Sequence, residues 1–93
     1  MKRLSPEEIN NELNTLNGWI YNNNSIEKGF ILKDFADALS FIIKCGIESE
    51  KADHHPDLLL YSWNKVKITL STHSEGGVTT NDIKLAQQIE KIN

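Results

Sequence analysis

The sequence predicts a single α+β domain in two layers, with the order helix, strand, strand, helix, strand, strand, helix. Three segments carry helix-start signals, at Ser5, Asp34 and Thr79, and strand-like pairs of segments lie between them. Helices interleaved with hairpins are typical of α+β domains. A chain of 93 residues, 39% hydrophobic and 25% charged, is long enough for one such domain, so we assign residues 1–93 to one domain.

The first part of the chain predicts a helix followed by a hairpin. In "SPEEINNEL", Ser5 can cap the helix, Pro6 suits its first position, and Glu8 completes a capping box. Gly18 ends this unit, and "WIY" is predicted to be a short strand. The cluster "NNNS" predicts a turn, because Asn tolerates positive φ, and "IEKGFIL" is the returning strand.

The middle of the chain predicts a long helix, "FADALSFIIKCGIESEKA", capped by Asp34. Helical spacing places one apolar stripe on it, formed by Phe35, Ala38, Leu39, Ile42 and Cys45. Three further apolar residues fall outside this stripe: Phe41, Ile43 and Ile47. A helix that is apolar on more than one side of so small a domain favours coverage by another subunit.

The second half of the chain predicts two strands and a closing helix. Pro56 stops the long helix, and "LLLY" is a candidate short strand. In "KVKITLST", Val66, Ile68 and Leu70 alternate with polar residues, which predicts a sheet with one face on a core. "EGG" turns the chain, and Thr79 begins the last helix.

Composition narrows the class of protein. Thirteen acidic and ten basic residues give a formal net charge of -3, which argues against direct nucleic-acid binding. The single cysteine, Cys45, cannot form an internal disulfide, which fits a reducing compartment. The start of the sequence lacks the apolar region of a secretory signal, and no apolar run is long enough to span a membrane. We therefore expect a cytoplasmic protein without membrane association.

All three histidines lie in two short segments, as His54 and His55 in "KADHHPDLLL" and His73 in "STHSEGG". Histidine can give or take a proton near neutral pH, so two of them in one pocket would supply an acid and a base. Glu50 precedes His54 by four residues and could orient its imidazole if the helix runs that far. Asp82 lies in the first turn of the last helix, near the turn that follows His73.

Each of these features has a plainer interpretation. The pair before Pro56 could be a solvated loop at a helix end, or the three histidines could bind zinc, although no HxH or HxxxH spacing is present. Asp82 could be only the capping-box acid of the last helix, and Thr72 only a β-branched strand residue. Tyr61 and Trp63 could be packed aromatic residues, and Trp19 is expected in the core.

An ordered set of residues between positions 50 and 86 matches a known pattern: an acid, three residues, His-His-Pro, a spacer, an aromatic residue, nine residues, His, and later Asp. The matching residues are Glu50, His54, His55, Pro56, Trp63, His73 and Asp82. With "WNKVKITLSTH" and "GGVTTNDIKLA", this set resembles the pterin-4a-carbinolamine dehydratases, also called 4a-hydroxytetrahydrobiopterin dehydratases. Weaker likeness extends back to "LNGW". Leu58 replaces an aromatic residue typical of animal members, and the spacer looks one residue longer.

The resemblance implies a four-stranded antiparallel sheet with three helices packed on one face, assembling into homodimers or homotetramers. It implies removal of water from a small-molecule substrate, 4a-hydroxytetrahydropterin, to give quinonoid dihydropterin. This reaction recycles the cofactor of aromatic amino-acid hydroxylases and needs no metal and no cofactor.

The resemblance also implies roles for single residues. We predict that His54 and His73 are the acid and the base, in an order that remains open, that His55 holds the substrate, and that Asp82 orients a histidine or the pterin. Substrate contacts are predicted for Glu50, His54, His55, Pro56, Thr72, His73, Ser74 and Glu75.

Two alternatives stay open. In animals a member of this family also serves as a dimerisation cofactor of a homeodomain transcription factor, and other relatives without the histidines act as assembly factors. The protein could therefore be a non-catalytic interaction protein. It could also be a dehydratase of a different pterin, such as a molybdopterin-related compound.

Overall fold

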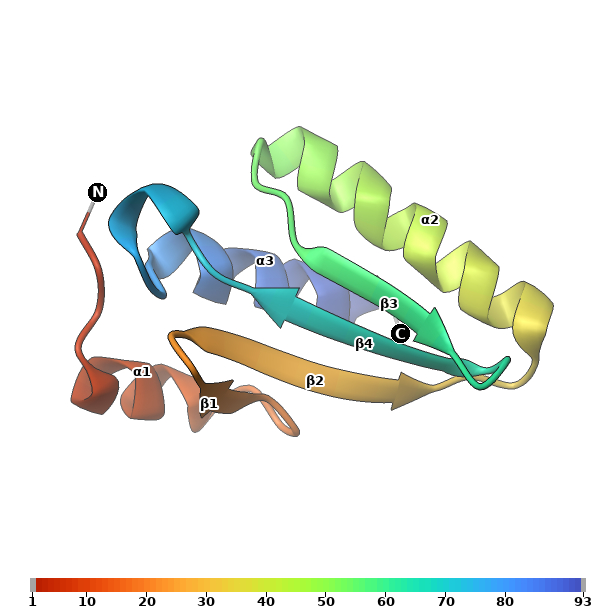
Figure 1. The fold of residues 1–93 in the computed structure, drawn as a ribbon, viewed down its shortest axis with the longest axis horizontal. Helices are drawn as coiled ribbons and strands as arrows, with labels where there is room; N and C mark the ends of the chain where they lie inside the picture. The colour runs from red at the N-terminus through yellow and green to blue at the C-terminus, as the bar shows by residue number, and fades with distance from the viewer. Residues whose placement is uncertain (1, 93) are drawn as a thin grey trace.

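The computed structural model describes residues 2–92 and has the predicted order of elements (Figure 1). The helices and strands are α1 (Pro6–Leu13), β1 (Ile20–Asn22), β2 (Ser25–Ile31), α2 (Phe35–Ala52), β3 (Asp57–Tyr61), β4 (Lys65–Leu70) and α3 (Thr80–Ile92). A short 3₁₀ turn, η1 (His73–Glu75), lies between β4 and α3. The α+β prediction is therefore confirmed.

The four strands form one antiparallel sheet in the order β1-β2-β4-β3. Asn23 and Asn24 connect β1 to β2 with φ of 50° and 64°, the positive values that a two-residue hairpin turn requires. Strands β2 and β4 pair from Ile26 opposite Leu70 to Ile31 opposite Lys65. This long pairing puts the start of β2 beside the end of β4, the end from which His73 follows.

The sheet has one face on the core and one open face. The alternation predicted for β4 is confirmed, because Val66, Ile68 and Leu70 are fully buried. The core also takes Ile26 and Phe30 from β2 and apolar residues from all three helices. The helices therefore cover one face of the sheet in a two-layer arrangement, with α2 and α3 in contact with each other.

The caps of the first two helices are as predicted. The Ser5 hydroxyl accepts a hydrogen bond from the Glu8 backbone N–H, and the Glu8 carboxylate accepts one from the Ser5 N–H, which together complete the capping box. The bond from the Ser5 backbone N–H to the Glu8 carboxylate is also the main cause that lowers the pKa of Glu8. The Asp34 carboxylate accepts from the Asp37 N–H at the start of α2.

The prediction of the apolar stripe on α2 was wrong in part. Ala38 and Cys45 are buried as expected, and Phe41 joins them in the core, where it packs against Phe30. Phe35 and Leu39 are instead 51% and 44% exposed. Both helical stripes are apolar, so spacing alone could not tell which one faces the sheet. The exposed stripe, Phe35, Leu39, Ile43 and Ile47, repeats every fourth residue and is called here the outer stripe of α2.

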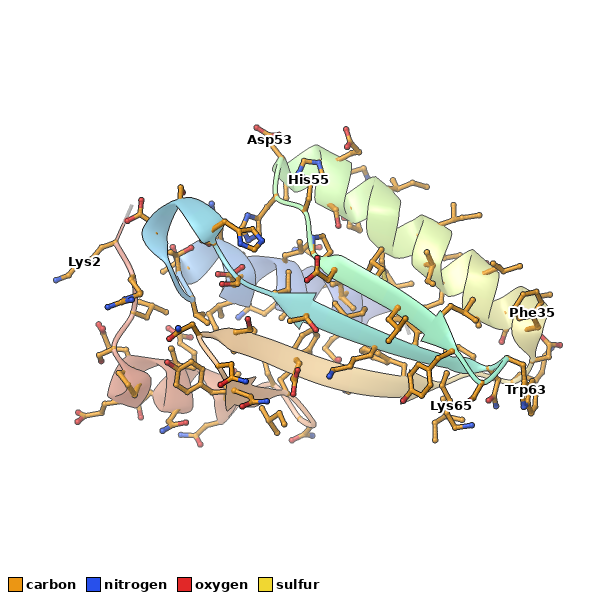
Figure 2. All side chains as sticks on the ribbon, in the orientation of Figure 1. Lys2, Phe35, Asp53, His55, Trp63 and Lys65 are labelled. Atoms are coloured by element: carbon orange, nitrogen blue, oxygen red, sulfur yellow. The ribbon has the colours of Figure 1, made fainter. Side chains whose placement is uncertain are left out.

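The aromatic residues singled out in the sequence differ in burial. Trp19 is buried as predicted, and its indole N–H donates to the Glu90 carboxylate, which also pairs with Lys28. Tyr61 and Trp63 are exposed, so packing within the chain does not account for them. Figure 2 shows Trp63 and Phe35 projecting at an end of the molecule distant from His55. Within residues 2–92, no helix has the length and apolar character needed to cross a membrane.

Candidate active site

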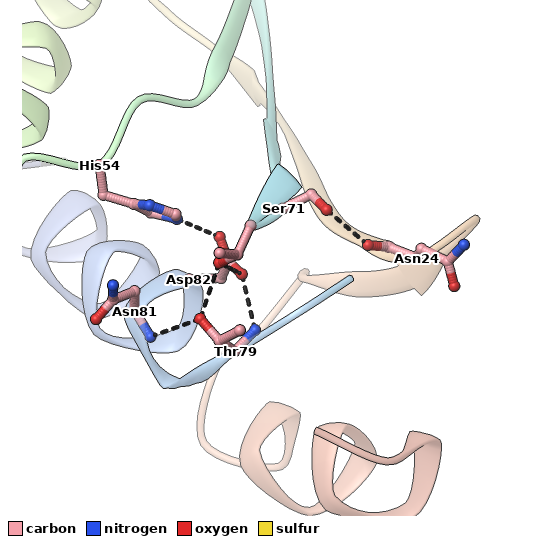
Figure 3. Close-up of polar contacts among 7 residues, drawn as sticks. Asn24, His54, Ser71, Thr79, Asn81 and Asp82 are labelled. Carbon is pink, nitrogen blue, oxygen red and sulfur yellow. Dashed lines mark hydrogen bonds and ion pairs between the residues drawn. The ribbon is translucent and has the colours of Figure 1, made fainter. Parts of the chain in front are cut away.

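Three segments that are distant in sequence meet around the side chain of Asp82. His54 follows the end of α2, Thr72 follows β4, and Asp82 lies in the first turn of α3. The ends of these three elements converge, which brings Thr72 and His54 into contact with Asp82. Figure 3 shows the contact between His54 and Asp82.

The Asp82 side chain is fully buried and has three hydrogen-bond partners. Its Oδ2 atom accepts from the Thr79 backbone N–H and from the Thr72 hydroxyl, both at 2.9 Å. Its Oδ1 atom lies 2.5 Å from Nε2 of His54. A buried carboxylate without such partners would strongly destabilise the fold, so this set of contacts explains how Asp82 can be buried at all.

A single carboxylate thus contacts both the start of α3 and His54. The bond from the Thr79 N–H is one half of a capping box at the start of α3. The other half would be a bond from the Asp82 N–H to the Thr79 hydroxyl, which is absent from residues 2–92. The Thr79 hydroxyl accepts from the Asn81 N–H instead. The second oxygen is left free to meet His54, which a purely structural cap would not need.

Glu50 does not orient His54, so this part of the prediction was wrong. Helix α2 ends at Ala52, and Asp53 takes the left-handed conformation with φ of 49°. The His54 backbone N–H then bonds back to the Ser49 carbonyl, which turns the chain away from the helix axis. Because the helix stops before His54, the four-residue spacing from Glu50 no longer places the two side chains together.

Glu50 contacts the other histidine of the pair. Nε2 of His55 lies 3.0 Å from the Glu50 carboxylate, and both side chains are exposed. Adjacent side chains of an extended segment point in opposite directions, so His54 turns toward α3 while His55 turns back along α2. Figure 2 shows His55 beside the end of α2 and near Asp53. The solvated-loop interpretation fits His55 but not His54.

His73 opens the 3₁₀ turn and is exposed, as are Ser74 and Glu75. Gly76 ends the turn in the left-handed conformation with φ of 70°, and its carbonyl accepts from the Arg3 guanidinium. Thr72 and Gly77 pair across the base of the loop. His73 is thus held one residue from the Asp82 network, but within residues 2–92 no hydrogen bond joins it to His54 or His55.

Two hollows flank the histidine pair. One, of about 580 Å³, is lined by Ile43, Gly46, Ile47, Ser49, Glu50, Lys51, His55, Pro56 and Leu58. The other, of about 220 Å³, is lined by Ala52, His54, Asn81, Lys84, Leu85 and Gln88. Neither includes all three histidines, and neither includes Thr72, His73, Ser74 or Glu75. The structure therefore brings Glu50, His55 and Pro56 to one hollow and His54 to another.

Thr79 is the residue of this network that sequence reasoning missed, because it was taken only as the start of the last helix. Its spacing of three residues from Asp82 was the available signal. In the part of the chain that the structure describes, no group of three or more His, Cys, Asp or Glu side chains is placed to hold a metal ion. Cys45 is buried, and burial raises the pKa of its thiol to about 12, which makes it an unreactive core residue.

Fold and site together define a small α+β domain that carries a histidine bonded to a buried carboxylate. The chain belongs to the family described as pterin 4 alpha carbinolamine dehydratase, whose model matches residues 2–92. The resemblance seen in the sequence is confirmed by this match.

Relatives in both archaea and bacteria support the family. A protein of Sulfolobus acidocaldarius, provisionally named a pterin-4-alpha-carbinolamine dehydratase, is 44% identical over 97% of this chain and 98% of its own length. A protein of Prochlorococcus marinus with the same provisional name is 51% identical over 80% of this chain and 77% of its own.

Two solved structures are similar. A transcriptional coactivator/pterin dehydratase from Brucella melitensis has a TM-score of 0.90 at 40% identity and covers 98% of each chain. A pterin dehydratase-like RuBisCO assembly factor of the alpha-carboxysome has a TM-score of 0.65 over 80% of this chain and 84% of its own. At 17% identity, the second likeness shows the fold alone.

Proposed function

We propose that the protein removes water from 4a-hydroxytetrahydropterin to give quinonoid dihydropterin, and so recycles the pterin cofactor of aromatic amino-acid hydroxylases. The observation that carries this proposal is the bond between His54 and the buried Asp82 in a chain of the pterin dehydratase family. A histidine oriented by a carboxylate is suited to proton transfer near neutral pH. Fold-level likeness alone would not carry an activity.

The proposed reaction needs one proton given and one proton taken. An imidazolium protonates the 4a-hydroxyl, the C–O bond breaks, and water leaves while the neighbouring ring nitrogen donates its electron pair to form a C=N bond. The cation then loses a proton to a base, so the sum is one pterin in, one pterin and one water out. We assign these two proton transfers to His54 and His73, in either order.

Most of the other residues predicted to contact the substrate are placed where a bound pterin would reach them. His55 and Glu50, paired at the rim of the larger hollow with Pro56, would hold the pterin. Ser74 and Glu75 follow His73 in an exposed turn and could contact a ligand bound there. Thr72 differs, because its hydroxyl is buried and bonded to Asp82.

The direct test is dehydration of synthetic 4a-hydroxytetrahydropterin by the purified full chain, before and after chelator treatment. We expect a rate well above the uncatalysed background and the same rate after chelation. A molybdopterin-related pterin is the competing substrate in the same assay. Activity that only added zinc restores would contradict the metal-free mechanism, and a background rate with every pterin would contradict the proposal.

A role in protein–protein contact is the second candidate, and the outer stripe of α2 favours it. Four large apolar side chains exposed on one helix face are unusual for a monomeric surface. We propose that they are covered in a homodimer or homotetramer. Light scattering at micromolar concentration should give the mass of an oligomer, and I43E should lower it; a monomer mass for the unaltered chain would contradict this proposal.

A further inference from the structure

Two buried hydroxyl groups link the loop after β4 to the start of α3. Oγ1 of Thr72 lies 2.8 Å from Oγ1 of Thr79 and 2.9 Å from Oδ2 of Asp82. A hydroxyl has one proton to donate, and an ionised carboxylate only accepts. The Thr72 proton therefore goes to Asp82, and the Thr79 hydroxyl must donate to Thr72. The direction of this chain of bonds is fixed.

The backbone completes the chain and leaves one oxygen of Asp82 for histidine. The Asn81 N–H donates to the Thr79 hydroxyl at 3.3 Å, and the Thr79 N–H donates to Oδ2 of Asp82 at 2.9 Å. Oδ2 thus accepts two hydrogen bonds, and Oδ1 faces Nε2 of His54. Since the carboxylate only accepts, Nε2 of His54 carries a proton.

The other ring nitrogen of His54 is accessible. Nδ1 forms no hydrogen bond within residues 2–92, and no side-chain nitrogen or oxygen there is both sealed from solvent and without a partner. Nδ1 therefore reaches solvent, although the side chain of His54 as a whole is only 11% exposed. In the neutral ring this nitrogen bears a free electron pair, because the single ring proton is on Nε2.

We infer that Thr79 and Thr72 are positioning residues that aim the Asp82 carboxylate, so that His54 keeps its proton on Nε2 and exchanges protons with a ligand through Nδ1. Neither hydroxyl needs to touch the substrate, because both are buried and directed at each other and at Asp82. Exchange with a pterin rests on the proposed function. The tautomer of His54 and its dependence on the two hydroxyls do not.

The test uses the full chain labelled with nitrogen-15 in its histidines, at alkaline pH where imidazoles are neutral. Two-bond nitrogen–proton correlation spectra report which nitrogen of each ring carries the proton, and H54Q identifies the signals of His54. We expect a single Nε2–H tautomer for His54 in the unaltered protein. T72V and T79V remove one hydroxyl each at nearly constant shape and should give a mixture of both tautomers. T72S and T79S should restore the single form.

Thr80 provides a matched control, because it is the next residue along, begins the same helix and is exposed. T80V should leave the His54 signals unchanged. In the dehydration assay, T72V and T79V should lower kcat about tenfold with KM nearly constant, and the serine variants should recover most of it. Thermal melts accompany every variant, because Thr79 also caps α3.

Two results would overturn the inference. One is an Nδ1–H tautomer in the unaltered protein, which needs no variant to fold. The other is a single Nε2–H form that persists in both T72V and T79V. If the unaltered chain dehydrates no pterin but the tautomer responds to the hydroxyls as expected, the positioning role is supported and the proposed function fails.

Discussion

His54 and His55 are neighbours in sequence, yet they lie in opposite physical settings. The side chain of His54 is 11% exposed and meets a carboxylate that is fully buried. The side chain of His55 is 59% exposed and meets Glu50, which is 80% exposed. An exposed pair of this kind contributes about 0–1 kcal/mol and is screened by salt, whereas the buried pair has a fixed geometry. This difference supports the proposal that His54 transfers protons and that His55 holds the ligand.

The largest expected effect is loss of the buried histidine. H54A should lower kcat by about 10²-fold or more, because a positioned acid or base is removed. H73A should have an effect of similar size, because His73 is proposed to carry out the second proton transfer. The double variant should lose less than the product of the two, since residues that act as one unit are not additive.

Steady-state kinetics beside thermal melts would check these effects. The melts separate lost chemistry from lost folding. Folded H54A and H73A proteins with nearly unaltered rates would refute the acid–base assignment and favour the interaction role.

Removal of the carboxylate partner should have the next largest effect. D82A should lower kcat in a folded protein, because His54 would lose the group that fixes its ring, and kcat should fall less than in H54A. The same substitution should reduce the free energy of unfolding by about 1 kcal/mol or more, since the bond to the Thr79 N–H is also lost. Urea unfolding and kinetics together give both values. A loss of stability with unchanged kcat would mean that Asp82 only caps α3.

The smallest effects are expected for the exposed pair, His55 and Glu50. H55A should raise KM and leave kcat nearly unchanged, since His55 is proposed to hold the substrate. E50Q should raise KM by less than about fivefold, the limit set by an exposed ion pair, and added salt should diminish the difference. Kinetics at two salt concentrations would measure both. A large fall of kcat in H55A would remove the proposed division between the two histidines.

Local features were predictable from the sequence because they depend on residues a few positions apart. The capping box of Ser5 and Glu8, the cap at Asp34 and the turn at Asn23 and Asn24 each involve neighbours within three residues. The buried face of β4 follows from an alternation with a period of two. The order of elements follows from such local signals. The family pattern from Glu50 to Asp82 is a linear order of residues, so it was recognisable without knowing which of them meet.

Only the tertiary structure decided which of these features meet. His54 and Asp82 are 28 residues apart, and their contact depends on where α2 ends and how α3 packs against it. The left-handed Asp53 separated His54 from Glu50, and packing against Phe30 selected Phe41 rather than Phe35 for the core. A sequence fixes the spacing of side chains along one element. The relative orientation of two elements is set by how all of their side chains pack at once, so contacts between distant segments are determined only in the folded chain.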